Sequence, residues 1–339
     1  MVADAERGAL ARTDATVGEL LERWFEQARD DFSPKTVLET RGILDRHLVP
    51  ALGQVPLHKL KPDALDRYYR SLRSGEANRG RPLSAATIRR IHGVLRRVLA
   101  QGVRWGWLGA NPAAAASPPR VVARDITPPA PAEVARLFAL AQAADPELAA
   151  FVVLAAATGA RRSEVVALRW ADLDLDAGVV RIARGIVMGP SGPVEKDTKT
   201  HAARKVSLDA TTLAVLRQHR ERVVNRAEVC RVTLAPTAFV FSPEVDGSQP
   251  WRPDSATRAF ARLCTSAGLE GLRLHDLRHY VATRLLASGV GVPTVAGRLG
   301  HRNAATTLNV YSHFLAEADR EAANILGSLF DEAVDAGER

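Results

Sequence analysis

The sequence predicts a mainly α protein with two domains, the first all-helical and the second mixed α/β, mostly helical with a small antiparallel sheet. Three observations lead to this fold class. Apolar residues recur at helical spacing along most of the 339 residues, strand-like alternation is found at 179–182 with a returning strand at 204–208, and an alanine- and proline-rich stretch occupies 112–130. A chain of this length suggests two domains more readily than one, and this stretch has the composition of a linker between them.

The N-terminal domain is expected over residues 15–111, after a short polar leader at 1–14. Each of its four helices begins with a residue pattern suited to a helix start, either a polar side chain that caps the exposed amide groups or a proline in the first turn. Thr16 also forms a capping-box pattern with Glu19. The expected starts are Thr16, Ser33, Lys61 and Ser84.

The fourth of these helices has two distinct faces. Its apolar face, from Ile88 to Gly102, is expected to pack in the core. Arginines gather on another face, which therefore presents a row of guanidinium groups, and both a solvated charged surface and a contact surface for a polyanion are compatible with it. These residues are Arg89, Arg90, Arg96, Arg97 and Arg104.

The second domain is expected over residues 131–313. Helices are expected around 133–143 and over the apolar run 148–157, followed by the two strands, which are separated by a turn-rich segment at 189–193. The rest of the domain, beyond the sheet, has helical patterns. A further amphipathic helix is expected over 314–339, where it either packs on its own domain or joins protomers.

The composition limits the class of protein. A formal charge of +8 and a pI near 10.0 favour a polyanionic partner, although charge alone does not establish one. Cys230 and Cys264 stand alone, which argues against a disulfide framework or a zinc site and favours a reducing, cytoplasmic compartment. The N-terminus lacks the apolar core of a signal peptide and the longest apolar run is too short to cross a bilayer, so no membrane partner is expected.

Four short motifs in the second domain stand out because of their residue types and their order. They are Thr158-Gly159-Ala160-Arg161-Arg162-Ser163-Glu164, then Thr198-Lys199-Thr200, then His275-Asp276-Leu277-Arg278-His279, and finally Leu299-Gly300-His301 followed by Tyr311. Each motif alone is weak, but the ordered set closely resembles the tyrosine recombinase (phage integrase) family. The resemblance covers nearly the whole chain from about residue 15, because the N-terminal helices also resemble that family's core-binding, SAM-like domain.

The residue types suit metal-free chemistry on a phosphodiester. Cleavage develops negative charge on the non-bridging oxygens, and a guanidinium can neutralise it because it donates two hydrogen bonds and keeps its charge. Arg161 and Arg278 match the family's two catalytic arginines. Arg161 is preferred to Arg162 because the motif has a glutamate three residues after its arginine. That residue, Glu164, is expected to orient the arginine or its helix, unless it forms only an ordinary helix ion pair.

The resemblance makes Tyr311 the nucleophile. A tyrosine has a pKa of about 10, so its ionisation at neutral pH costs roughly 4 kcal/mol and requires a base or a positive field nearby. His275 matches the family's general base or proton shuttle. His301 matches a position whose side chain hydrogen-bonds the scissile phosphate. His279 resembles a supporting residue, with ordinary packing as the alternative.

Lys199 resembles the β-hairpin lysine that acts as the general acid for the leaving 5′-oxygen, although Lys196 and Lys205 lie close by. The implied reaction forms a 3′-phosphotyrosyl intermediate and releases a 5′-hydroxyl, so rejoining needs no nucleotide cofactor. Neither a metal nor another cofactor is expected. The implied partners are double-stranded DNA attachment sites, the other protomers of a homotetramer in the synaptic complex and, where direction is controlled, a directionality factor. The arginine row would then contact DNA.

Other interpretations stay open from the sequence. Asp172, Asp174 and Asp176 alternate and would suit a two-metal nuclease. A non-catalytic DNA-binding regulator is an alternative from another class, and a Xer-like dimer resolvase has the same chemistry as an integrase. The spacing from His301 to Tyr311 and the long hairpin favour an integrase of a phage or integrative element. Because few residues precede the first helix, we also expect a minimal recombinase that needs no arm-type DNA sites.

Overall fold

The computed structural model describes residues 13–122, 127–197, 203–301 and residue 323. The chain divides into two compact units, Met1–Arg124 and Asp125–Arg339. The fold is of the predicted mainly α class, and the strands of the described residues all belong to small antiparallel sheets in the second unit. Within these residues, no helix is both long and apolar enough to span a bilayer.

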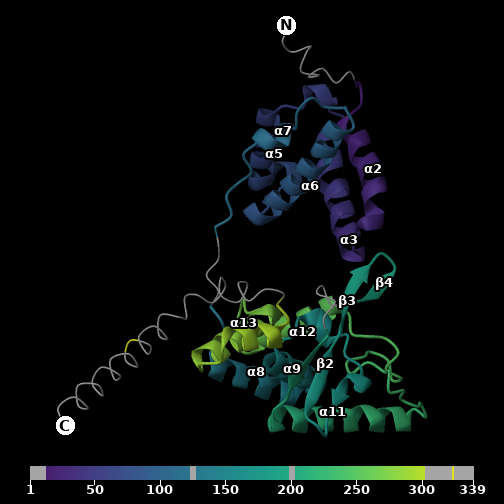
Figure 1. Cartoon of the computed structure of the whole chain (residues 1–339), viewed down its shortest axis with the longest axis vertical. Helices are drawn as coiled ribbons and strands as arrows, with labels where there is room; N and C mark the ends of the chain where they lie inside the picture. Colours follow the sequence, from purple (N-terminus) through teal and green to yellow (C-terminus); the bar gives the residue numbers. More distant parts are fainter. Residues whose placement is uncertain (1–12, 123–126, 198–202, 302–322, 324–339) are drawn as a thin grey trace, which may run out of the picture. The chain divides into compact units, whose positions relative to one another are not determined.

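The N-terminal unit is a group of helices around α6 (Ala85–Arg104), which contacts α2, α3 and α5 (Figure 1). The apolar face of α6 is buried from Ile88 to Gly102, as its periodicity predicts. The other helices are α2 (Val17–Ala28), α3 (Pro34–Ile43), α4 (Val49–Leu52), α5 (Pro62–Ser74) and α7 (Pro112–Ala115), with a π-helical turn at Leu44–Leu48 and 3-10 turns at Arg29–Asp31, Leu57–Lys59 and Glu76–Asn78.

The expected helix starts of this unit are confirmed, and three of them by side-chain caps. The Oγ1 of Thr16 accepts from the amide of Glu19 at 3.3 Å, while the Glu19 carboxylate accepts from the amide of Thr16 at 2.7 Å. Ser33 and Ser84 cap α3 and α6 in the same way, each by accepting from a backbone amide in the first turn. Helix α5 follows Lys61 with proline in its first turn.

The N-terminal unit extends further than residue 111. Asn111 caps α7 by accepting from the amide of Ala113 at 2.9 Å, and α7 packs against α5 and α6. The amide of Ser117 then donates to Asp66 of α5 at 2.7 Å. The segment expected as a linker at 112–130 therefore begins with a helix of this unit, because alanine is a strong helix former as well as a common linker residue.

The C-terminal unit is built around α9 (Pro146–Thr158), which is buried along most of its length. Helices α8, α11 and α13 pack against it, and Figure 1 shows α9 between α11 and α13. The small alanines of α9 let these neighbours approach closely. The other helices are α8 (Pro131–Ala144), α10 (Arg162–Val165), α11 (Ala210–Val229), α12 (Pro253–Ser266), α13 (Leu274–Ala287) and α14 (Val292–Leu299), with a 3-10 turn at Trp170–Asp172.

The predicted strand pair is present. Strand β2 (Val179–Ile182) pairs antiparallel with β5 (Arg204–Ser207), and β1 (Leu173–Asp174) completes a sheet of order β1-β2-β5. The turn-rich segment is the tip of a separate hairpin of β3 (Arg184–Gly189) and β4 (Gly192–Asp197), and these two strands were not predicted from the sequence. Its glycines, prolines and charged residues obscure the alternation of a strand.

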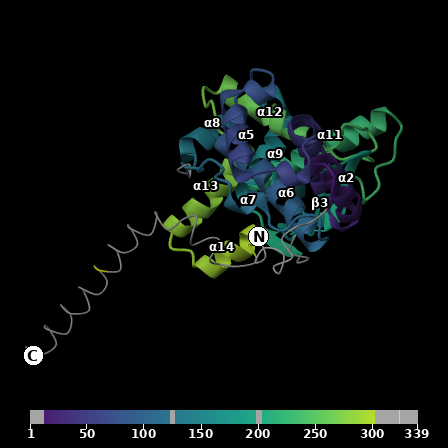
Figure 2. The same ribbon diagram turned by 90° about the horizontal axis from the view of Figure 1, so that it is seen from above.

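Helices α13 and α14 form one edge of the unit. Figure 2 shows α14 beside α13, away from α11. The two helices share a small apolar cluster of Val281, Ala282, Val295 and Leu299. The base of the β3–β4 hairpin packs against α10. These elements place the motif residues of α10, α13 and α14 around the C-terminal end of α9.

Candidate active site

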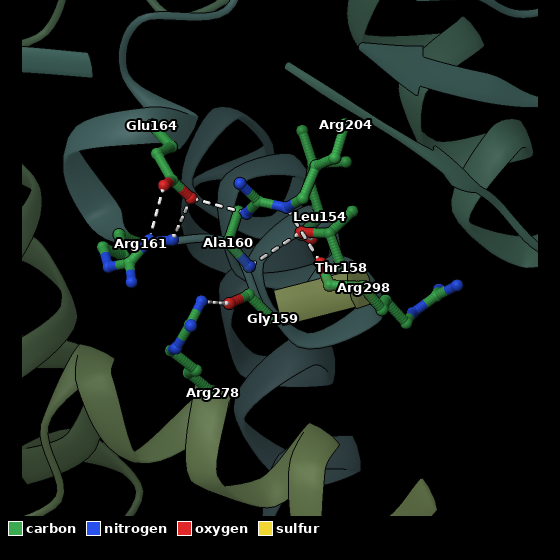
Figure 3. Close-up of polar contacts among 9 residues, drawn as sticks. All are labelled: Leu154, Thr158, Gly159, Ala160, Arg161, Glu164, Arg204, Arg278 and Arg298. Atoms are coloured by element: carbon green, nitrogen blue, oxygen red, sulfur yellow. Dashed lines mark hydrogen bonds and ion pairs between the residues drawn. The ribbon is translucent and has the colours of Figure 1, made fainter. Parts of the chain in front are cut away.

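The first motif forms the turn between α9 and α10. Gly159 ends α9 in the left-handed conformation, with a φ of +64°, and a Cβ at this position would lie 2.4 Å from Cδ2 of Leu299. Thr158 is buried, and its hydroxyl accepts from the amide of Ala160 at 3.2 Å. The turn is thus fixed by its own hydrogen bonds and by packing, and it places Arg161 directly before α10 (Figure 3).

The two neighbouring arginines of this motif have different partners. Arg161 donates from its Nη1 to Oε1 of Glu164 at 2.8 Å and from its amide to Oε2 of the same residue at 2.9 Å. Arg162 instead bonds the hydroxyl of Thr257 and pairs with Asp254 at 3.4 Å, both on α12. Arg162 therefore joins two helices, whereas Arg161 stays at the turn with its side chain partly exposed.

Glu164 is held by two arginines. Its carboxylate is 4% exposed, and its Oε2 accepts from Nη2 of Arg204 at 2.6 Å as well as from the amide of Arg161. Burial alone would raise the pKa of Glu164, but the hydrogen bond and charge of Arg204, followed by the contributions of Arg161, leave this pKa below its ordinary value. Arg204 was not predicted as a site residue, because the sequence shows it only as the first residue of a strand.

Helix α13 brings the third motif to the same turn. Arg278 is 4% exposed, and its Nη1 donates to the carbonyl of Gly159 at 2.7 Å (Figure 3). The rings of His275 and His279 meet edge to face with their centroids 4.8 Å apart. His279 is buried, which favours a supporting role, while His275 is exposed to solvent. Asp276 accepts from the amide of Arg273 at 2.8 Å and so fixes the start of the helix.

The electrostatics of the histidines show that these groups form one cluster. Partial burial, then the positive charges of His279 and Arg278, lower the pKa of His275 to about 4. Burial, then Arg278 and Arg161, lower the pKa of His301 to about 4 as well. Both rings are therefore neutral at neutral pH, and each keeps a nitrogen lone pair that can accept a proton or a hydrogen bond.

The predicted catalytic and supporting residues that the structure describes thus converge. Arg161, Arg278, His275 and His301 act on one another electrostatically, and Glu164 and His279 support them. Two arginines beside two neutral histidines can bind and polarise a phosphate without a metal. Lys199, Tyr311 and, apart from residue 323, the segment 314–339 lie outside the described residues.

The aspartates that suggested a metal site have other partners. Asp172 accepts from the amide of Arg169 at 3.0 Å and from the guanidinium of Arg184. Asp174 accepts from the amides of Asp176 and Ala177, which is ordinary turn geometry. In the part of the chain that the structure describes, no group of three or more acidic, histidine or cysteine side chains is arranged to hold a metal ion.

The arginine row of α6 is exposed along its whole length. Arg104 donates to Gln101 at 2.9 Å and Arg89 to the carbonyl of Pro119 at 3.5 Å, whereas Arg90 and Arg97 have no side-chain partner among the described residues. The row is therefore accessible to a ligand of opposite charge.

The chain belongs to the phage integrase family. The model of that family matches residues 130–318, and the model of the N-terminal SAM-like domain of phage integrases matches residues 16–73. The first match contains the whole cluster described above, and the second covers α2 to α4 and all of α5 except its last residue.

Relatives along nearly the full chain carry related names. A XerC-like tyrosine recombinase of Caldanaerobacter subterraneus is 25% identical, with 94% of this chain and 84% of that protein covered. A prophage phiRv2 integrase of Mycobacterium tuberculosis is 26% identical over 94% of this chain and 80% of its own length. Among solved structures, the Tn1549 transposon integrase with transposon right end DNA has a TM-score of 0.74 at 20% identity, covering 92% of this chain and 99% of that one, which establishes the shared fold.

Proposed function

We propose that the chain is a site-specific DNA recombinase, an integrase of a phage or integrative element, that cleaves and rejoins duplex DNA through Tyr311. The observation that carries the proposal is the convergence of Arg161, Arg278, His275 and His301 from separate elements into one cationic cluster with proton-accepting rings. Such a cluster suits an anionic phosphodiester, because its charges are already in place when negative charge develops in the transition state.

The proposed reaction proceeds in two transesterification steps. The phenolic oxygen of Tyr311 attacks phosphorus, its proton passes to His275, and Arg161 and Arg278 stabilise the non-bridging oxygens. His301 hydrogen-bonds the phosphate. Lys199 protonates the leaving 5′-oxygen, so that a 3′-phosphotyrosyl bond forms while a 5′-hydroxyl is released. A 5′-hydroxyl from a second duplex then reverses these steps, and the bond energy is conserved without a nucleotide cofactor.

The same proposal assigns the partners. Two duplexes with two strands each require four active sites, which a homotetramer on DNA supplies. A lambda integrase solved as a tetramer bound to a Holliday junction has a TM-score of 0.64 at 17% identity, covering 90% of this chain and 80% of that one. In this assembly the arginine row of α6 would contact DNA, and the segment 314–339 would join protomers. Direction of the reaction would be set by a separate factor.

A dimer resolvase is the second candidate, and the name of the XerC-like relative favours it. The two functions share every chemical step and differ in the sites they join. A resolvase recombines two copies of one site, whereas an integrase joins two different sites. Recombination of plasmids that carry identical or different sites would separate them.

The chemistry is tested by covalent trapping. Duplexes that the purified chain selects from a random-sequence pool would be rebuilt with a nick near the cleavage position, so that the cut fragment diffuses away. The wild-type chain should then form a protein–DNA adduct that survives SDS, while Tyr311→Phe should bind the duplex equally well and form none, because only the phenolic oxygen is lost. Tyr280→Phe is the matched control, since Tyr280 is described on α13 outside the cluster, and it should form the adduct normally. An adduct in Tyr311→Phe would disprove the assignment.

A further inference from the structure

Arg204 lies at a junction of three elements of the candidate site. It is the first residue of β5, its side chain is only 10% exposed, and its Nη2 donates to Oε2 of Glu164 at 2.6 Å. Its Nε donates to the carbonyl of Arg298 in α14 at 2.9 Å. Figure 3 shows its guanidinium group beside Glu164, above the turn that carries Arg161.

The space around Arg204 is closely fitted. A Cβ on Gly300 would lie 2.7 Å from Nη1 of Arg204, so the glycine that precedes His301 leaves room for the guanidinium. Arg298 itself donates to the carbonyl of Ala157 at 2.8 Å and to that of Ser207 at 3.1 Å. The end of α14 is therefore tied both to α9 and to β5, next to the residue that leads into His301.

Arg204 is also the stronger of the two cations that stabilise the buried carboxylate. Glu164 is almost fully buried, whereas the side chain of Arg161 is 37% exposed and partly screened by solvent. A buried carboxylate without a cation is costly and tends to become protonated. The charge on Glu164 that holds Arg161 therefore depends on Arg204.

We propose that Arg204 is a positioning residue for the recombination reaction, which fixes Arg161 through Glu164 and the His301 end of α14 through the carbonyl of Arg298. This inference rests on the proposed function. Arg204 lies five positions after Lys199 in the chain. The Arg204 guanidinium thus links β5, the strand that follows Lys199, both to Glu164 beside Arg161 and to the end of α14 that leads into His301.

The proposal predicts a pH dependence that the wild-type chain lacks. When Arg204 is neutralised, burial raises the pKa of Glu164 from its present lowered value. Below the raised pKa, Glu164 is protonated and holds Arg161 only weakly, whereas above it the carboxylate is charged and the contact returns. The ratio of variant to wild-type cleavage should therefore fall as the pH falls and recover as the pH rises. A ratio cancels the titration of the nucleophile and of the histidines common to both proteins.

The test compares Arg204→Gln, which removes the charge but keeps a polar side chain, with Arg204→Lys, which keeps the charge but cannot span both acceptors. On nicked duplexes built from the selected sequences, Arg204→Gln should cleave about 10–100-fold more slowly near neutral pH, a loss like that seen when the hydrogen-bond partner of a metal ligand is removed. Arg204→Lys should recover most of the loss and show no added pH dependence. Arg217→Gln is the matched control. Arg217 also donates to a backbone carbonyl, that of Leu175 at 2.7 Å, yet it lies outside the cluster.

A double-variant cycle tests the route of the effect. Glu164→Gln should reproduce the part of the Arg204→Gln defect that depends on pH, and the double variant should lose less than the sum of the two single losses, because both changes break the contact between Arg204 and Glu164. Additive losses, or a pH-independent loss in Arg204→Gln, would overturn the proposal. So would an Arg204→Lys variant as slow as Arg204→Gln.

A measurement without catalysis separates this inference from the proposed function. In protein labelled with ¹³C at glutamate carboxyl groups, the Glu164 resonance, assigned with Glu164→Gln, should titrate at higher pH in Arg204→Gln than in the wild-type chain. If the wild-type chain cleaves no DNA but the resonance shifts as expected, the proposed function fails and the coupling of Arg204 to Glu164 stands. An unshifted resonance in a folded variant refutes the coupling, whatever the activity.

Discussion

Gly159→Ala should destabilise the C-terminal unit and disrupt the cluster, because the turn admits no side chain. The residue has a φ of +64°, which costs a residue with a Cβ about 1–2 kcal/mol. Its Cβ would also lie 2.4 Å from Cδ2 of Leu299 and 3.3 Å from Cγ1 of Val281. Such overpacking in a closely packed core adds about 1–3 kcal/mol. The expected loss in the free energy of unfolding is therefore about 2–5 kcal/mol in total.

Gly268→Ala is the matched control for the steric part of this loss. Gly268 has a φ of +65°, but a Cβ there would meet no atom within 4 Å. It should lose only the conformational contribution of about 1–2 kcal/mol. Thermal unfolding would be compared for both variants, since each kcal/mol moves the Tm of a domain of this size by about 2–4 °C. A Gly159→Ala variant no less stable than Gly268→Ala would refute the packing argument.

The same substitution should impair DNA cleavage beyond its effect on stability. The carbonyl of Gly159 accepts from Arg278, and the side chain that the new Cβ meets belongs to Leu299, close to His301 in the chain. Relief of the clash must move the turn or α14, and either movement changes the position of Arg278 or His301 relative to Arg161. Adduct formation on nicked duplexes, measured well below the Tm of the variant, should be reduced while DNA binding is retained. Normal cleavage by folded Gly159→Ala protein would show that the turn tolerates movement.

Two further predictions concern DNA binding and the leaving group. Neutralising Arg90 and Arg97 should make the salt dependence of DNA binding shallower, by about 0.9 in log–log slope for each phosphate that is no longer neutralised. Arg73→Ala on α5 serves as the control. An unchanged slope would mean that the arginine row is an ordinary solvated surface. Lys199→Ala should slow cleavage about 10²–10⁴-fold, as expected for loss of a general acid. A 5′-bridging sulfur, which needs no proton to leave, should restore the rate, and an equal defect in Lys196→Ala would reassign the role.

The features of the fold that the sequence predicted are those with local causes. Thr16, Ser33 and Ser84 cap the helices that follow them, because a cap depends on a side chain and amides a few residues away. The β3–β4 hairpin was not predicted, since its glycines and prolines obscure the strand pattern and its contacts with other elements, such as the ion pair of Arg184 with Asp172, are not visible in the sequence. Helix α7 was missed for a similar reason, because its burial against α5 and α6 is not visible in an alanine-rich composition.

The candidate site shows the same division between local and non-local information. The spacing from Arg161 to Glu164 identified the arginine correctly as the one paired with that glutamate, because residues three apart at a helix start can contact one another directly. Arg162 is held away from the cluster by its contacts with Thr257 and Asp254, which are far away in the chain. Arg204 was missed because nothing in its own segment distinguishes it from any arginine at a strand start. Its importance arises from the buried carboxylate of Glu164, which the fold places against it. A sequence motif can therefore identify the groups that face a substrate, whereas the groups that hold them in place are found only in the three-dimensional structure.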